Sequence, residues 1–405
     1  MAVGLGMPGR LLPVDGLRLG VAPAGIRYRE RNDLLIIAAE EGTCGAAVFT
    51  RNAFCAAPVQ LARKHLAMFA PRYLLVNAGN ANAGTGDAGM AAARETCHIL
   101  AERAGCAPEA VLPFSTGVIG EPLPVEKFPE GIACALDDLR ADGWLDAART
   151  IMTTDTLPKA CSRQTTISGR KVTLTGIAKG SGMIHPNMAT LLVFVGTDAG
   201  LSQTLLDRAL RKAVDGSFNS ITVDGDTSTN DACILLATGK SGLLIEDETS
   251  QDYATFAGLL ADLCRELAQA VVRDGEGATK FVTIEIDTAY SVEEARQVAF
   301  AVAHSPLVKT ALFASDPNWG RILAAVGRSG LVDLDAGRVD LEINGVRIAT
   351  AGGRDPGYTE AQGQEALAQA DLLIRIALAR GTAKTRVWTT DLSHEYVRIN
   401  ADYRS

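Results

Sequence analysis

The 405-residue chain lacks the features that mark several large classes of protein. No run approaches the roughly 18 uninterrupted apolar residues of a membrane-spanning helix. Residues 1–15 carry no basic segment followed by an apolar core, so we expect no secretory signal. The formal net charge of −8 argues against a broad surface for nucleic acid or for an anionic membrane. Together these absences indicate a cytoplasmic protein whose partners are neither nucleic acids nor membranes.

Metal-binding and hydrolase motifs are missing as well. The eight cysteines include no CxxC pair, and none stands with a histidine at the spacing of a zinc site. We interpret the cysteines as small core residues of a protein from a reducing compartment. No GxSxG segment occurs, which disfavours the Ser/His/Asp triad of an α/β-hydrolase. We therefore expect no metal centre.

The residues that are present fit a globular protein: 47% are hydrophobic and 21% are charged. Hairpin turns are indicated at residues 168–170 and at Asn344-Gly345. Mixed hairpins and helices predict an α/β protein with layered mixed sheets, not a Rossmann fold. No clear domain boundary is visible.

Hydrophobic periodicity predicts the individual elements. Ser202 and Asp316 are candidate helix caps. Strands are expected at residues 34–38, 46–49, 73–77, 111–114, 171–177, 191–196, 233–237, 281–286, 339–343 and 396–399, and helices at residues 88–104, 203–214, 253–272, 292–303 and 360–379.

One glycine motif suggests a dinucleotide site. Residues 84–89, Gly-Thr-Gly-Asp-Ala-Gly, match GxGxxG between a strand and a helix. However, an Asn-rich segment separates the glycines from the strand, and the next strand leads to Ser115 and Thr116 rather than to an acid. A glycine-rich turn before a helix explains the motif. A nucleotide-binding dehydrogenase is the alternative that a cofactor titration tests.

The most informative segment is residues 179–195, KGSGMIHPNMATLLVFV. A glycine-rich loop leads into an apolar strand, and the small Ala189 precedes Thr190 at the start of that strand. This arrangement fits a self-cleaving nucleophile, whose hydroxyl attacks the preceding carbonyl before water releases a new N-terminus. The freed α-amine, with a reference pKa of about 7.7–8.0, can then act as base for the same hydroxyl. On spacing alone, a threonine that starts a strand is more often structural.

The same segment resembles the ornithine acetyltransferase family of arginine biosynthesis, also called glutamate N-acetyltransferase. The likeness covers nearly the whole chain and includes residues 115–120, 152–156, 222–231, 274–280, 315–321 and 400–405. The resemblance implies a sandwich architecture like that of N-terminal-nucleophile enzymes. It also implies self-cleavage between Ala189 and Thr190, with fragments 1–189 and 190–405 that stay associated as a heterotetramer of two copies each. No cofactor is implied.

The resemblance further implies ping-pong acetyl transfer. Thr190 would accept acetyl from N2-acetylornithine and pass it to glutamate, with Thr116 and Gly117 forming the oxyanion hole. The substrate positions implied by the family are Thr153, Lys179, Thr190, Glu276, Asn400 and Ser405. Lys179 suits a substrate carboxylate and Glu276 an ammonium group. Thr154 and Thr156 compete with Thr153, and Ser405 replaces the terminal threonine of many members while keeping a hydroxyl.

Two questions stay open at the level of sequence. Some family members also take acetyl from acetyl-CoA, and we expect this bifunctional activity here, although no residue distinguishes it from the monofunctional one. An N-terminal-nucleophile amidohydrolase or aminopeptidase would share the cleavage and the acyl-threonine. In that alternative, water rather than an amine would resolve the ester.

Overall fold

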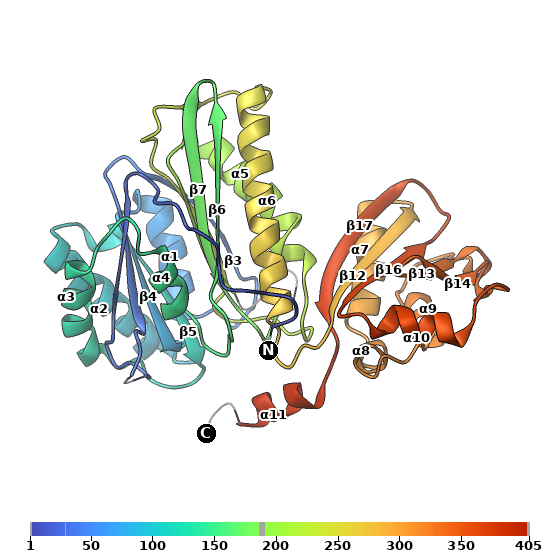
Figure 1. Ribbon diagram of the computed structural model, residues 1–405. Coiled ribbons are helices and arrows are strands. Elements are labelled where there is room, and N and C mark those ends of the chain that lie inside the picture. Colours follow the sequence, from blue (N-terminus) through green and yellow to red (C-terminus); the bar gives the residue numbers. More distant parts are fainter. Residues whose placement is uncertain (1, 29, 186–190, 403–405) are drawn as a thin grey trace. The chain divides into compact units, whose positions relative to one another are not determined.

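Two mixed β-sheets stack against each other in the larger of the two units into which the chain divides (Figure 1). The computed structural model describes residues 2–28, 30–185 and 191–402. The larger unit consists of Met7–Asn219 and Asp226–Val271, and the smaller unit of Met1–Gly6, Ser220–Gly225 and Val272–Ser405. Each unit is built around a hydrophobic core of its own.

The two sheets of the larger unit differ in strand number. The first contains, in spatial order, β1 (Leu17–Ala22), β2 (Leu34–Ala39), β4 (Tyr73–Asn80) and β5 (Val111–Val118). The second contains β3 (Cys44–Phe49), β10 (Ala232–Ala237), β8 (Leu192–Thr197), β7 (Arg170–Lys179) and β6 (Lys159–Ile167). Only the β4–β5 and β10–β8 pairs of these sheets run parallel. A short parallel pair, β9 (Gly200–Leu201) and β11 (Leu244–Ile245), lies apart from both.

The core between the two sheets is formed by alternate residues of their strands. On β2, Leu35 and Ile37 belong to this core. Leu34 and Ile36 point to the opposite face of the sheet, which helices cover. This two-sided burial explains why β2 is apolar along its whole length. A fully buried side chain of this size contributes about 1.5–3 kcal/mol relative to an exposed one.

Helices cover the outer faces of both sheets. The first sheet packs against α1 (Ala57–Met68), α2 (Gly86–Ala104) and α3 (Phe128–Asp137). The second packs against α5 (Gln203–Asp215) and α6 (Gln251–Arg273), and α4 (Trp144–Thr150) contributes Trp144 to the core between the sheets. Short 3-10 helices lie at η1 (Pro108–Ala110), η2 (Val125–Lys127) and η3 (Phe218–Ser220). The larger unit is therefore a sandwich of four layers, with two sheets inside and helices outside.

The smaller unit is a six-stranded mixed sheet with helices on one face. In spatial order its strands are β15 (Gly353–Arg354), β14 (Val346–Thr350), β13 (Asp340–Ile343), β16 (Asp371–Ala377), β12 (Phe281–Ala289) and β17 (Ala383–Thr390). Its other elements are α7 (Val292–Ala303), α8 (Pro306–Phe313), α9 (Trp319–Gly327), η4 (Ala336–Arg338), α10 (Glu360–Ala368) and α11 (His394–Asp402). On the other face, Glu285 accepts hydrogen bonds from Arg375 at 2.8 Å and from Arg386 at 2.5 Å on the two neighbouring strands.

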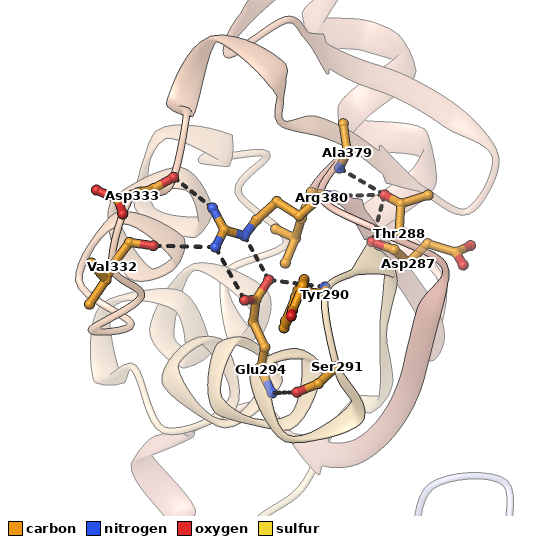
Figure 2. A network of polar contacts seen from close by, with 10 residues as sticks. Asp287, Thr288, Tyr290, Ser291, Glu294, Val332, Asp333, Ala379 and Arg380 are labelled. Atoms are coloured by element: carbon orange, nitrogen blue, oxygen red, sulfur yellow. Dashed lines mark hydrogen bonds and ion pairs between the residues drawn. The ribbon is translucent and has the colours of Figure 1, made fainter.

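A polar network joins three connections of the smaller unit (Figure 2). Arg380, in the β16–β17 loop, donates to Glu294 of α7 at 2.8 Å and to the carbonyl oxygens of Val332 and Asp333 at 3.3 and 2.6 Å. Thr288 Oγ1 accepts from the backbone N–H of Ala379 at 2.8 Å. The network therefore fixes the loops at one end of the sheet.

Most of the expected elements are present, and the expected class of layered mixed α/β sheets is confirmed. The helix over residues 292–303 has the predicted bounds, and the hairpin at Asn344-Gly345 joins β13 to β14 as expected. The helix predicted at 360–379 is wrong in its second half, because residues 371–377 form β16. The buried residues Leu372, Ile374 and Ile376 alternate there with more exposed residues, which is the pattern of a strand.

The strand predicted at 396–399 is also wrong, because these residues belong to α11. Ser393 Oγ accepts a hydrogen bond from Tyr396 N at 3.4 Å, as a helix cap does. Arg398 then pairs with Glu395 and Asp402 at helical spacing. These local interactions outweigh the strand propensity of the tyrosine and the β-branched residues. Ser202 does precede α5, whereas Asn318 rather than Asp316 precedes α9.

The division at Val272 has no counterpart in the sequence analysis, which finds no boundary. The predicted fragments 1–189 and 190–405 concern a covalent break rather than packing, so they stay a prediction. Among the described residues, no helix is long and apolar enough to cross a membrane.

Candidate active site

Thr116 and Gly117, the expected oxyanion residues, lie near the end of β5, where it runs beside β4. Thr116 is buried, with 6% of its surface exposed. Gly117 has a φ of +136°, and a side chain there would collide with the backbone of Gly79 and Asn80. Glycine alone tolerates both the positive φ and this close approach. The crowding of two strand ends therefore fixes the turn.

Lys179, expected in the substrate site, is the last residue of β7 and contacts Thr116. Lys179 Nζ donates to Thr116 Oγ1 at 3.1 Å, and only 3% of the lysine is exposed. The two residues come from different sheets of the sandwich. The fold thus places a buried cation against a hydroxyl group, and such a pair is suited to stabilise developing negative charge.

Thr153 precedes β6 and is connected to the end of β7 through Asp155. The Asp155 carboxylate accepts hydrogen bonds from Thr153 N at 3.0 Å, from Gly180 N at 2.7 Å and from Lys159 Nζ at 2.6 Å. The side chains of Asp155 and Lys159 are both completely buried. Thr154, the competitor of Thr153, instead shares a 2.6 Å hydrogen bond with Ser181. The carboxylate therefore joins two expected site segments.

The charge state of Asp155 follows from its surroundings. Burial by itself raises the pKa of a carboxyl group. Here the ammonium groups of Lys159 and Lys179, with the hydrogen bonds from Lys159 and Thr153, outweigh burial and hold the pKa of Asp155 well below its usual range. The carboxylate is therefore ionised at neutral pH. Asp155 lies within the motif at residues 152–156, but nothing in the sequence alone predicts a role for it.

Buried asparagines support the oxyanion turn, and the sequence analysis does not predict this. Asn77 accepts from Ser115 Oγ at 2.6 Å and donates to the Asn80 carbonyl at 2.8 Å. Asn230 donates to the carbonyl oxygens of Ser115 and Ala81 at 3.0 and 2.6 Å. The available signal was the run of asparagines at residues 77–82, directly after an apolar strand.

Asp231 binds the residue that follows the expected nucleophile. Its Oδ1 accepts a hydrogen bond from Leu191 N at 2.8 Å. Burial raises the pKa of Asp231 well above its usual value, although the bond from Leu191 and the charge of Lys179 oppose the rise. Ala189, Thr190 and Ser405 lie outside the described residues, so their expected roles stay predictions.

Glu276 and Asn400 lie together in the smaller unit. Asn400 Nδ2, on α11, donates to Glu276 Oε2 at 2.7 Å and to the Tyr396 carbonyl at 3.0 Å. Glu276 is half-buried and Asn400 is exposed. An amide donor that orients a carboxylate prepares it to bind an ammonium group. The described site residues thus form two groups, with Thr116, Gly117, Thr153 and Lys179 in the larger unit and Glu276 and Asn400 in the smaller one.

The described part of the chain contains no cluster of metal-ligating side chains. No three histidine, cysteine or acidic side chains there are grouped so that they can hold an ion. The hydroxyl, ammonium and carboxylate groups above are instead those of acyl transfer.

Comparison with known proteins decides the family. A model of the ArgJ family matches residues 18–405. The chain belongs to the ArgJ family. A curated relative, the arginine biosynthesis bifunctional protein ArgJ of Pseudomonas syringae pv. tomato, is 55% identical over 406 residues and is covered completely, as is this chain. The family indicated by residues 179–195 and the expectation of an enzyme are thereby confirmed.

Two solved structures of ArgJ-type proteins are similar to parts of the chain. The bifunctional protein ArgJ of Bacillus halodurans is 37% identical, covering 50% of this chain and 95% of that one, with a TM-score of 0.48. The ornithine acetyltransferase of Mycobacterium tuberculosis, solved with ornithine, is 31% identical, covering 44% of this chain and 94% of that one, with a TM-score of 0.38.

Within this ArgJ-family chain, the GxGxxG motif is structural. Asn82 donates to the Gly89 carbonyl at 2.9 Å and accepts from Thr85 Oγ1 at 2.9 Å. Gly86 begins α2. The motif therefore forms the turn at which α2 begins, which agrees with the expected glycine-rich turn.

Proposed function

We propose that the chain, an acetyltransferase of arginine biosynthesis, moves acetyl from N2-acetylornithine to glutamate through an ester on Thr190. The observation that carries the proposal is the buried hydrogen bond from Lys179 to Thr116. It provides a hydroxyl and a cation where an acyl-transfer intermediate needs donors. Lys179 lies opposite Leu192 in the pairing of β7 with β8. Leu192 follows Thr190 by two residues, so Lys179 lies at the end of β7 that is beside the start of β8.

The first step in this proposal is self-cleavage. The Thr190 hydroxyl attacks the Ala189 carbonyl carbon, the peptide C–N bond breaks, and the Ala189 acyl group moves from nitrogen to oxygen. This shift frees the α-amine of Thr190, and water then hydrolyses the ester to give the Thr190 hydroxyl and a carboxylate on Ala189. The free amine takes the hydroxyl proton in each later attack.

Acetyl transfer follows in two half-reactions. The Thr190 oxygen attacks the acetyl carbonyl of N2-acetylornithine, and ornithine leaves with a proton on its amine. The amine of glutamate then attacks the acetyl ester, so that N-acetylglutamate leaves and the hydroxyl is restored. Each tetrahedral intermediate carries an oxyanion, which the Thr116 hydroxyl and the Gly117 N–H would stabilise.

Substrate recognition needs groups of both signs because ornithine and glutamate are zwitterions. We assign Lys179 to a carboxylate and Glu276, oriented by Asn400, to an ammonium group. Thr153 and Ser405 complete the set as hydroxyl donors. Variants at each of these positions test the assignments.

The proposal includes acetyl-CoA as a second acetyl donor. The Pseudomonas syringae relative is named a bifunctional protein, which supports this extension. We also propose that the two fragments remain together as a heterotetramer with two copies of each. Native mass measurement checks the assembly, and an assay with acetyl-CoA and glutamate checks the donor.

Intact mass analysis tests the central proposal. Purified protein should give fragments 1–189 and 190–405, and N2-acetylornithine should add one acetyl group to the second fragment. Glutamate should then discharge that group as N-acetylglutamate. Release of free acetate alone would instead identify a hydrolase. Thr190→Ala should stay uncut and inactive, whereas a processed, active Thr190→Ala protein would contradict the proposal.

A further inference from the structure

We propose that Asp155 is a positioning residue of the oxyanion site, which holds the Lys179 ammonium against Thr116 so that the Thr116 hydroxyl points its hydrogen at the oxyanion. The inference rests on the oxyanion role proposed for Thr116. It assigns a task to a buried ion pair that neither the family resemblance nor the sequence motifs single out.

Asp155 lies where it contacts both Lys159 and the backbone next to Lys179. One carboxylate oxygen accepts from Lys159 Nζ at 2.6 Å and from Gly180 N at 2.7 Å. Gly180 directly follows Lys179, so this oxygen anchors the backbone from which the Lys179 side chain extends. The same carboxylate attracts the Lys179 ammonium electrostatically. Asp155 thus acts on Lys179 through both the chain and its charge.

The second step concerns the hydroxyl of Thr116. A hydroxyl has one hydrogen and two acceptor sites. Because Lys179 Nζ donates to Thr116 Oγ1 at 3.1 Å, the oxygen is an acceptor in that bond and its own hydrogen must point elsewhere. The adjacent cation also polarises the hydroxyl and makes it a stronger donor. Lys179 therefore sets both the direction and the strength of the donor that the oxyanion meets.

The third step is the cost of keeping the pair. Lys159 and Asp155 are completely buried, and a buried ion pair contributes little net stability compared with apolar residues of the same size. Lys159 donates to Asp155 and also to the Leu157 carbonyl oxygen at 3.3 Å. A role in holding Lys179 and Gly180 gives the pair a function beyond stability.

A double-mutant cycle tests this role. We expect Asp155→Asn to lower kcat about 10- to 100-fold with little change in KM, since a misplaced donor acts on the transition state. Thr116→Val should lower kcat about 100- to 1,000-fold. Because both act through one hydroxyl, the double variant should be no more than about twofold slower than Thr116→Val alone. Additive losses would overturn the inference.

Stability must be separated from positioning, because Asp155→Asn leaves the Lys159 ammonium buried without its anion. The cycle is therefore repeated in a Lys159→Met background, which removes that cation. The same non-additivity is expected there, with the unfolding midpoint recovered. If Lys159→Met restores kcat together with stability, Asp155 is purely structural and the inference fails. Asp146→Asn is the matched control, since Asp146 is a partly exposed carboxylate on α4 paired with Arg140 and Arg149.

The outcomes separate the inference from the function beneath it. If Thr116→Val keeps full kcat, the proposed oxyanion role itself is wrong. If Thr116→Val is slow but the Asp155 effect is additive, only the inference is wrong. Intact mass gives the cleaved fraction of every variant. An Asp155→Asn chain that stays uncut while Thr116→Val matures would also overturn the inference, because Asp155 would then act on another group.

Discussion

Two buried lysines, one in each unit, are held in different ways. Lys159 of the larger unit donates to the Asp155 carboxylate at 2.6 Å. Lys309 of the smaller unit donates to Thr389 Oγ1 at 3.1 Å and also contacts the carbonyl and hydroxyl oxygens of Thr390. The carboxylate that Lys159 contacts carries a charge, whereas the hydroxyl and carbonyl oxygens that Lys309 contacts are neutral.

The pKa of Lys309 reflects this difference. Burial lowers the pKa of Lys309 to about 8, although the charges of Asp391 and Asp224 oppose the decrease. The comparison teaches that burial alone does not define the role of a lysine. Lys309, buried among neutral oxygens, has a pKa that is lowered toward physiological pH.

The largest expected effect on stability comes from Lys159→Met. The change leaves the completely buried Asp155 without its nearest cation, and breaking one side of a buried pair costs about 3–5 kcal/mol. Urea unfolding followed by hydrogen exchange in the larger unit measures the loss. A change below about 1 kcal/mol would show that Lys179 and the backbone donors alone stabilise the carboxylate.

The loss in Lys159→Met should also depend on pH. The folded pKa of Asp155 lies below its unfolded value, so the ionised carboxylate stabilises the native protein above the unfolded pKa, about 3.9. This contribution disappears as the pH falls through the lower, folded pKa. The difference in unfolding free energy between wild type and Lys159→Met should therefore narrow in acid.

Lys309 should make the smaller unit more stable in mild alkali. Its folded pKa of about 8 is below the ordinary 10.5, so between these values the unfolded chain binds more protons and stability rises with pH. The full rise is about 3 kcal/mol at most. Unfolding curves from pH 7 to pH 10 measure it. Lys309→Met is the control, and an identical rise in that variant would assign the effect to other groups.

The smallest of the three effects is expected at Arg380. Arg380 pairs with Glu294 (Figure 2). Their side chains are 24% and 12% exposed, so this pair is less deeply buried than Lys159 and Asp155. Arg380→Met should cost about 1–2 kcal/mol and leave kcat unchanged. Hydrogen exchange in residues 328–340 should quicken, because the Val332 and Asp333 carbonyls lose their donor. A fall in kcat would show that Arg380 affects catalysis as well as the loops it holds, and would contradict the contrast with Lys159 and Asp155.

The sequence predicts the fold best where local rules and packing agree. The helix over residues 292–303 has the predicted bounds because Ser291 accepts from Glu294 N and the apolar residues repeat at helical spacing. The Asn344-Gly345 hairpin follows from its turn residues alone. The predictions at residues 371–377 and 396–399 are wrong because the deciding contacts lie outside each segment. Residues 371–377 pair with neighbouring strands, and the helix at 396–399 is capped by Ser393.

The candidate site shows the same limit. The family resemblance predicts Thr116 and Lys179 as site residues, and the structure places them in hydrogen-bond contact. Asp155 was missed because a carboxylate in a polar Thr-Thr-Asp-Thr turn ordinarily faces water. In the structure its contacts with Lys159 of β6 and with Gly180, directly after β7, accompany its complete burial. Asn77 and Asn230 were missed for the same reason, since their partners lie in other strands.

The place of β8 has a consequence for the proposed break in the chain. This strand lies between β7 and β10 and is hydrogen-bonded on both sides. A cut before Thr190 would leave a single sheet woven from two polypeptides, with β3, β6 and β7 from one and β8 and β10 from the other. Because β8 would keep both of its neighbours, the pieces would separate only if the sheet itself came apart.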